Sequence, residues 1–206
     1  MYICPKCHDS LTCIEGNVCV KCGKPLTDRI EYCTDCKKTF HLYDQGAGLY
    51  RYDAIRQSIY RIKYGGRREY LDYYADELVE HLGEQIRYWD ADAIIGVPLH
   101  RKRLQKRGYN QADELARRIA DKMKLPFYKN YVLRVKNTSP QKGLDANERQ
   151  NNLKKAFIIG QNVVKLKTII VVDDIYTTGS TMDAIADVLK SAGVEHVYFV
   201  TLAIAV

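Results

Sequence analysis

The segment best equipped for chemistry in this chain joins an apolar run to two acidic residues and a hydroxyl-rich turn. Residues 168–172 are expected to form a buried strand that delivers Asp173 and Asp174 at its carboxyl end. The turn that follows contains Thr177, Thr178, Gly179, Ser180 and Thr181 and leads into an expected helix. Backbone N–H groups at a helix start favour a phosphate dianion, and paired carboxylates suit a ribose cis-diol, directly or through Mg²⁺. A helix cap needs only one hydroxyl group, whereas four of the five turn residues carry one. This number favours a phosphate site over simple capping.

A second candidate segment, residues 97–111, follows another apolar run and has five Lys and Arg residues but no acidic one. Its candidate anion-binding residues are His100, Arg101, Lys102, Arg103 and Arg107. A basic surface that is only solvated usually has acidic residues interspersed among the basic ones. The segment is therefore interpreted as an anion-binding loop at the carboxyl end of a strand.

Cysteines form the third group, and all seven lie before residue 37. The candidate metal ligands are three Cys-x2-Cys pairs: Cys4 with Cys7, Cys19 with Cys22, and Cys33 with Cys36. Two such pairs close a tetrahedral zinc site, and Gly23 suits the tight turn of a zinc knuckle. The middle pair has a partner on either side, 11 residues before it or 10 residues after it. The remaining pair either recruits Cys13, His8 or His41 or stays free, although a surface position is favoured for both histidines.

Composition separates the cysteine-rich segment from the rest of the chain. Residues 1–45 have balanced charge, so the formal net charge of +7 lies in residues 46–206. We expect a zinc-ribbon module over 1–45 and a second domain over 46–206, with a helical lead-in, or hood, over 46–90 and a core over 91–206. No apolar run is long enough to span a membrane and no signal region opens the chain, so no membrane insertion and a cytoplasmic location are expected. Thiols stay reduced there, which favours metal binding over disulfides.

The elements that position these residues alternate between strand and helix. Ile55, Ile59 and Ile62 predict a helix that ends at Gly65 and Gly66, and residues 41–49 are interpreted as a linker. Further helices are expected over 69–88, 110–124 and 182–192, and strands over 91–97, 131–135, 156–159, 168–172 and 196–205. Residues 136–152 are expected to be a long polar loop. Such alternation predicts an α/β fold with a mainly parallel sheet and ligands at the carboxyl ends of its strands.

The acidic pair and its turn resemble the phosphoribosyl-pyrophosphate (PRPP) motif of type I phosphoribosyltransferases. The resemblance implies that Asp173 and Asp174 contact ribose hydroxyls while residues 177–181 hold the 5′-phosphate. The whole chain resembles the ComF family in its cysteine pairs and in four further motifs. These are Tyr60-x2-Lys63-Tyr64-Gly65, Val97-Pro98-Leu99 with Arg107-Gly108-Tyr109-Asn110-Gln111, Gln141-x2-Leu144-x4-Arg149-x2-Asn152, and Val171 to Gly179.

This resemblance implies a type I phosphoribosyltransferase-like core that binds PRPP with Mg²⁺, beside a structural zinc module. The basic segment would then face pyrophosphate, and Lys142 and Arg149 would lie on a mobile loop that covers the site. An unknown amine or base would accept the ribosyl phosphate. Thr177 stands where purine-salvage members carry an Asp, which makes purine salvage less favoured.

ComF resemblance also implies an association with natural competence, the uptake of single-stranded DNA. The alternative function is a non-enzymatic accessory that binds single-stranded DNA, docks a helicase and keeps a retained or sensory PRPP pocket. Seven tyrosines at positions 50–74 stand among basic residues and have two interpretations: stacking of DNA bases, or packing. Packing is the favoured one.

Overall fold

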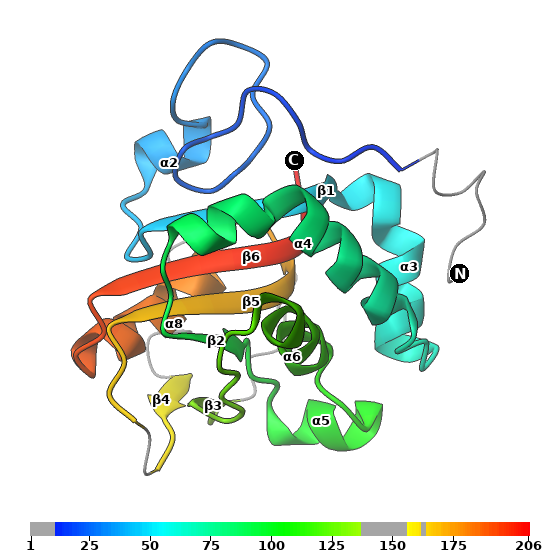
Figure 1. Cartoon of the computed structure of the whole chain (residues 1–206), viewed down its shortest axis with the longest axis vertical. Helices are drawn as coiled ribbons and strands as arrows, with labels where there is room; N and C mark the ends of the chain where they lie inside the picture. The colour runs from blue at the N-terminus through cyan, green and yellow to red at the C-terminus, as the bar shows by residue number, and fades with distance from the viewer. Residues whose placement is uncertain (1–10, 137–155, 162–163) are drawn as a thin grey trace.

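The computed structural model describes residues 11–136, 156–161 and 164–206, and a parallel sheet lies at its centre (Figure 1). The strand order is β1-β6-β5-β2, and the strands are β1 (Gln45–Arg51), β2 (Ala93–Gly96), β5 (Thr168–Tyr176) and β6 (His196–Ile204). Two short strands, β3 (Val132–Arg134) and β4 (Phe157–Ile159), pair antiparallel beside it. The predicted α/β fold with a mainly parallel sheet is confirmed.

Helices cover both faces of this sheet (Figure 1). They are α2 (Thr34–Lys38), α3 (Tyr52–Tyr64), α4 (Tyr70–Tyr88), α5 (Arg101–Arg107), α6 (Gln111–Met123) and α8 (Ser180–Ser191). The helix predicted from the isoleucine spacing is α3, and its three isoleucines are buried. Among the described residues, no helix combines the length and apolarity needed to cross a bilayer.

The strands alternate their side chains between two apolar cores, as the two-residue period of a strand requires. Ile170 and Val172 of β5 face a core that includes buried residues of α3, α4 and α6. Ile169 and Val171 face the opposite core, which includes buried residues of α8 and three cysteines. The continuous apolar run of β5 is therefore explained by burial on both faces.

The interpretation of residues 41–49 as a linker is wrong, because Gln45–Arg51 is an edge strand paired in parallel with β6. The linker was predicted from Gly46 and Gly48, because glycine is usually found in loops. A Cβ atom at Gly46 would collide with the ring of Phe199, and one at Gly48 would collide with Ile204. These glycines are thus needed for close packing against side chains of β6 and do not serve as a hinge.

The lengths of the central strands create an open edge at one end of the sheet. β2 ends at Gly96, opposite Val172, whereas β5 continues beside β6 as far as Tyr176, opposite Ile204. Residues of β5 beyond Val172 therefore have a neighbouring strand on one side only. This end of the sheet corresponds to the crevice that the predicted topology assigns to ligands.

Candidate functional site

The acidic pair lies in this open part of β5, and its main partner is a lysine from α3. Lys63 Nζ forms an ion pair with Asp174 Oδ2, and Gln111 Nε2 lies 3.4 Å from Asp174 Oδ1. The Lys63 side chain is 19% exposed and that of Asp174 is 9% exposed, so the pair is well shielded from water. Sequence analysis gave no site role to Lys63 or Gln111, although both belong to motifs quoted for the ComF resemblance.

The two carboxyl groups titrate differently because only one has a close cation. Burial raises the pKa of Asp173 well above its usual value, and the neighbouring Asp174 charge raises it further. Burial would also raise the pKa of Asp174, but Lys63 outweighs this effect and lowers it. Asp174 is therefore the carboxyl group that ionises more easily, because the Lys63 ammonium favours its charged form.

The turn after β5 presents an open helix start. Gly179 is the N-cap of α8, with φ = 81°, and it has no side chain to cap the helix. A Cβ atom there would lie 2.8 Å from Tyr176 Oη and 2.9 Å from His41 Cε1, so the position requires glycine. Thr178 Oγ1 and Ser180 Oγ are 2.9 Å apart. Thr177 is exposed, and Thr181 is the second residue of α8. The turn therefore places backbone amides and hydroxyl groups at the positive end of the α8 helix dipole.

The basic segment is largely helical, which corrects its interpretation as a loop. The side chain of His100 accepts a hydrogen bond from Lys102 N at the start of α5, and Gly108 ends the helix with φ = 81°. Because a helix turns about 100° per residue, its cations cannot all face one ligand. Arg103 and Arg107, four residues apart, are half-buried, whereas Arg101 and Lys102 are exposed.

The half-buried cations of α5 are connected to the acidic pair. Arg107 hydrogen-bonds to Gln111 Oε1, and Gln111 reaches Asp174 through its amide nitrogen. Burial lowers the pKa of Arg134 on β3; the charge of Arg103 acts in the same direction and that of Asp173 in the opposite one. These interactions place Arg134 within electrostatic reach of both Arg103 and Asp173. Nothing in the sequence distinguishes Arg134 beyond its being a basic residue in a short apolar strand.

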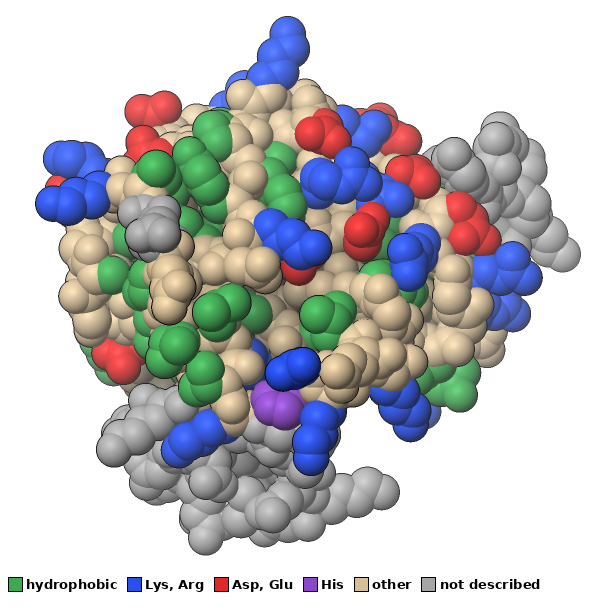
Figure 2. Space-filling view, turned by 90° about the horizontal axis from the view of Figure 1, so that it is seen from below, with side chains coloured by type: hydrophobic (Ala, Val, Ile, Leu, Met, Phe, Trp, Pro, Cys, Tyr) green, Lys and Arg blue, Asp and Glu red, His purple; other side chains and the backbone are tan. Residues whose placement is uncertain are grey.

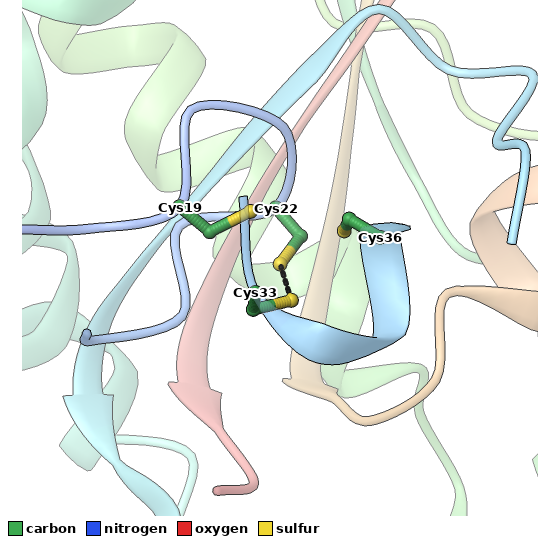
Figure 3. Close-up of side chains that lie close together, drawn as sticks. All are labelled: Cys19, Cys22, Cys33 and Cys36. Carbon is green, nitrogen blue, oxygen red and sulfur yellow. Dashed lines mark hydrogen bonds between the residues drawn. The ribbon is translucent and has the colours of Figure 1, made fainter. Parts of the chain in front are cut away.

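Four of the predicted metal ligands lie together beside the sheet (Figure 3). The sulfur atoms of Cys19, Cys22, Cys33 and Cys36 all lie within 4.8 Å of one another. Cys22 Sγ and Cys33 Sγ are 3.7 Å apart, close to the separation of about 3.8 Å expected between thiolates bound to one zinc ion. The structure thus brings together the middle and last pairs, with Gly23 at φ = 74° in the knuckle between them.

Without a cation, the thiols of this cluster differ in how easily they ionise. Burial would raise the pKa of Cys19, but the backbone N–H groups of Cys33, Cys22 and Lys21 outweigh it and lower the pKa to about 7. Burial raises the pKa of Cys22 to about 12 and that of Cys36 even further, with neighbouring thiolates adding to the shift. Four ionised thiols at this distance need a cation among them, and a four-thiolate set is one that zinc prefers.

Residues between the cysteines and β1 reach the turn 177–181. Tyr43 Oη lies 2.8 Å from Tyr176 Oη, and His41 Nδ1 lies 2.8 Å from Asp183 Oδ2 in the first turn of α8. Leu42 N donates to the other carboxylate oxygen of Asp183 at 2.8 Å. His41 is 3% exposed, so the interpretation as a surface imidazole is wrong. His41 is buried against Asp183, which lies 142 residues later in the chain. No local sequence pattern indicates such a contact.

A groove of about 610 Å³ adjoins the acidic pair. It is lined by Ile175 next to Asp174 and by residues of α3: Tyr52, Arg56, Gln57, Ile59, Tyr60, Arg61, Lys63 and Tyr64. The seven tyrosines at positions 50–74 differ in exposure: Tyr50 and Tyr74 are buried, Tyr60 and Tyr64 are 64% and 66% exposed, and the other three are half-buried. The exposed rings are 5.0 Å apart, and the Arg107 guanidinium lies 5.4 Å from the centre of the Tyr64 ring.

The face that carries α5 and β3 has a mixed but locally basic surface. Figure 2 shows this face with Lys and Arg side chains around a histidine at its lower end and acidic groups farther away. Four candidate residues, Cys4, Cys7, Lys142 and Arg149, lie outside the described residues, as does most of the expected 136–152 loop.

Comparisons with known proteins agree with this architecture. Residues 90–205 match the phosphoribosyl transferase domain family. The chain is 32% identical over 191 residues to competence protein F of Haemophilus influenzae, covering 87% of this chain and 81% of that protein. It is 29% identical over 199 residues to the DNA utilization protein YhgH of Escherichia coli K12, covering 95% and 87%. It is also 26% identical over 207 residues to competence protein ComFC of Bacillus subtilis, covering 93% and 79%. The chain therefore belongs to the ComF family of proteins with a phosphoribosyl transferase domain.

Proposed function

We propose that this protein binds PRPP with Mg²⁺ at the carboxyl end of β5 and acts as a phosphoribosyltransferase. The observation that carries the proposal is a shielded acidic pair placed directly before a helix start that only glycine can form. In the reaction, the bond between C1 of the ribose and pyrophosphate breaks, and a bond from C1 to an acceptor nitrogen forms. Pyrophosphate leaves with the electron pair, and the acceptor nitrogen loses a proton.

Each part of the site has a role in this proposal. Asp173 and Asp174 bind the ribose hydroxyls and supply oxygen ligands suited to Mg²⁺, which would neutralise charge on the pyrophosphate. The turn 177–181 holds the 5-phosphate through its amides and hydroxyls. Arg103 and Arg107 face the pyrophosphate, with His100, Arg101 and Lys102 adding weaker, more exposed charge, and Lys142 and Arg149 remain proposed loop cations.

Lys63 gives this site a built-in counterion. Its ammonium neutralises Asp174 in the described structure, so a Mg²⁺ ion or a ribose hydroxyl has to compete with it or share the carboxylate. PRPP binding should therefore depend on how easily Lys63 leaves or shares Asp174. The acceptor would approach from the groove on α3, where Lys63 and Ile175 are both part of the lining.

The test is calorimetric titration of PRPP with Mg²⁺ into the full chain and into Asp173→Asn/Asp174→Asn. We expect the double variant to lose PRPP binding, because it lacks the charge that holds the hydroxyls and the metal. Asp187→Asn is the matched control, since Asp187 is exposed on α8 and should leave affinity unchanged. PRPP affinity that is equal in all three proteins would refute the site. Pyrophosphate release across a panel of bases and amines would then separate an enzyme from a sensor that binds PRPP without turnover.

We also propose that Cys19, Cys22, Cys33 and Cys36 bind a structural zinc ion. Its support is the four-thiol geometry and the backbone N–H groups directed at Cys19. Free thiols of this kind suit a reducing compartment, which supports a cytoplasmic location for the protein.

Binding of single-stranded DNA is the second candidate function, favoured by the exposed tyrosines of α3. Tyr60 and Tyr64 present two neighbouring rings beside Arg56 and Arg61, the combination that stacks bases while holding phosphates. The names of the relatives, a competence protein and a DNA utilization protein, agree with a role in competence, where a helicase is the expected partner.

Fluorescence anisotropy with a labelled oligonucleotide tests this second function. Affinity should fall steeply between about 50 and 200 mM salt, and Tyr60→Ala/Tyr64→Ala should weaken it by about 2 kcal/mol or more. Tyr88→Ala is the control, because Tyr88 is 86% exposed at the end of α4 outside the groove. Undetectable binding at both salt concentrations would eliminate the proposal.

A further inference from the structure

Cys13 is the one described cysteine outside the four-thiol cluster, and the structure places it against β1. It forms an isolated antiparallel bridge with Tyr50, and Ile14 N donates to Leu49 O at 2.7 Å. Cys13 and Ile14 therefore lie along the outer edge of the sheet, beside β1. Leu11 and Cys13 are both packed against the core that α3 and α4 share.

Two residues of α4 meet the Cys13 thiol at this edge. Glu77 and His81 are four residues apart, so they lie on the same face of the helix. Cys13 Sγ, a Glu77 carboxylate oxygen and a His81 ring nitrogen all lie within 4.8 Å of one another. The Glu77 side chain is 12% exposed and that of His81 is 37% exposed, which leaves the group shielded on one side and reachable on the other.

The distances and donor types suit one particular ion. Ligands at 2.0–2.3 Å from a tetrahedral zinc ion are about 3.5 Å apart, so atoms within 4.8 Å of one another need to close by at most about 1.3 Å. His81 Nε2 and Glu77 Oε2 are already only 3.9 Å apart. Thiolate, imidazole and carboxylate together are a zinc-type set, whereas Mg²⁺ and Ca²⁺ prefer oxygen ligands alone.

The alternative is a group held together by hydrogen bonds without a metal. Tyr50 Oη donates to Glu77 Oε2 at 2.9 Å, and Tyr50 is completely buried. This bond is compatible with metal binding, because a carboxylate has about four acceptor positions. Metal-bound carboxylates are themselves commonly oriented by such a hydrogen bond, and the rigid Tyr50 provides it here.

We propose that Cys13, Glu77 and His81 bind a second zinc ion, with a water molecule completing the tetrahedron. This site is separate from the four-thiol cluster, and its ligands come from the segment around Cys13 and from α4. Its effect is to fasten the segment around Cys13 to α4, just ahead of the four-thiol cluster in the chain. It does not depend on PRPP or DNA binding.

Zinc content of the purified full chain, measured by atomic emission against protein concentration, tests the proposal. We expect two zinc ions per chain in the wild type and one in His81→Ala and in Cys13→Ser. His196→Ala is the matched control, because His196 is another exposed histidine and lies on β6 outside both clusters. Cys33→Ser should also lose one ion, but from the other cluster.

His81→Ala should fold, because the residue is exposed on a helix and alanine is the best helix former. Far-ultraviolet circular dichroism checks this directly. In cobalt-substituted protein, the ion lost in His81→Ala should have weaker thiolate charge-transfer absorption than the ion lost in Cys33→Ser, since one thiolate binds it instead of four. The proposal is overturned if His81→Ala keeps the zinc content of the wild type, whether that content is one ion or two.

Discussion

Replacing Lys63 by methionine tests whether its ammonium holds the charge of the acidic pair. The variant keeps most of the apolar stem but leaves Asp174 without its cation, while burial still opposes ionisation. A shielded pair of this kind loses about 4 kcal/mol of Coulomb energy at an effective dielectric constant of 20. Allowing for the desolvation cost that Lys63 no longer bears, we expect the free energy of unfolding to fall by about 2–4 kcal/mol at pH 7.5.

The pH dependence of this cost follows from the lowered pKa of Asp174. Stability from such a carboxylate is present above its unfolded pKa and is lost as the pH falls. The variant can escape the penalty by protonating Asp174, which costs about 5 kcal/mol at pH 7.5 but only about 1.5 kcal/mol at pH 5. The difference between wild type and Lys63→Met should therefore shrink to at most about 1.5 kcal/mol at pH 5.

Urea unfolding followed by tryptophan fluorescence measures this difference, because Trp89 is the single tryptophan, is 4% exposed and stacks on Tyr198. The wild type, Lys63→Met, Asp174→Asn and the double variant form a complete cycle. We expect a coupling energy of at least about 1.5 kcal/mol at pH 7.5. Coupling below about 0.5 kcal/mol, or a cost that is equal at both pH values, would show that Lys63 does not serve as the counterion.

Two further predictions concern the cysteine cluster and a buried carboxyl group. Cys33→Ser should weaken zinc binding by more than about 100-fold, because loss of a hydrogen-bond partner of a metal ligand alone costs about 10–100-fold in affinity. Competition with a chelator measures the zinc affinity. An unchanged affinity would contradict the four-thiol site. Burial raises the pKa of Asp113 to about 6, so its ionisation should destabilise the fold as the pH rises from about 4 through 6. Asp113→Asn should remove this loss, worth up to about 3 kcal/mol at pH 8, whereas parallel stability profiles from pH 5 to pH 8 would contradict the assignment.

The parts of the fold that sequence predicts well are those set by local patterns. The three isoleucines of α3 recur at helical spacing and are all buried, and the apolar run before Asp173 lies in β5, one of the two inner strands. The strand at 45–51 was missed because its glycines serve a contact with β6, about 150 residues away in the chain. A close contact between residues far apart in the chain cannot be recognised from a short stretch of sequence.

The candidate site divides in the same way. Asp173, Asp174 and the turn up to Thr181 are contiguous, so their chemistry could be interpreted from residue types alone. Lys63 and Asp174 are far apart in sequence, and their pairing exists only because α3 packs beside the end of β5. For the basic segment, composition predicts the positive charge but not the direction in which each side chain points. That direction depends on α5, which leaves most of its cations exposed to solvent and only Arg103 and Arg107 half-buried.

The cysteine cluster and the turn 177–181 are parts of one packed region, even though composition separates them. Cys19, Cys22 and Cys33 share an apolar core with Tyr43, Tyr176 and residues of α8. Tyr43 contacts the Tyr176 hydroxyl, and His41 contacts Asp183 in a buried position. These two contacts hold the turn in place before and after Gly179. Since a Cβ at Gly179 would approach both Tyr176 and His41, the shape of the turn is fixed by residues that follow directly from the cysteine cluster. The residues that pack against the turn 177–181 therefore belong to the same apolar core as three of the four cysteines.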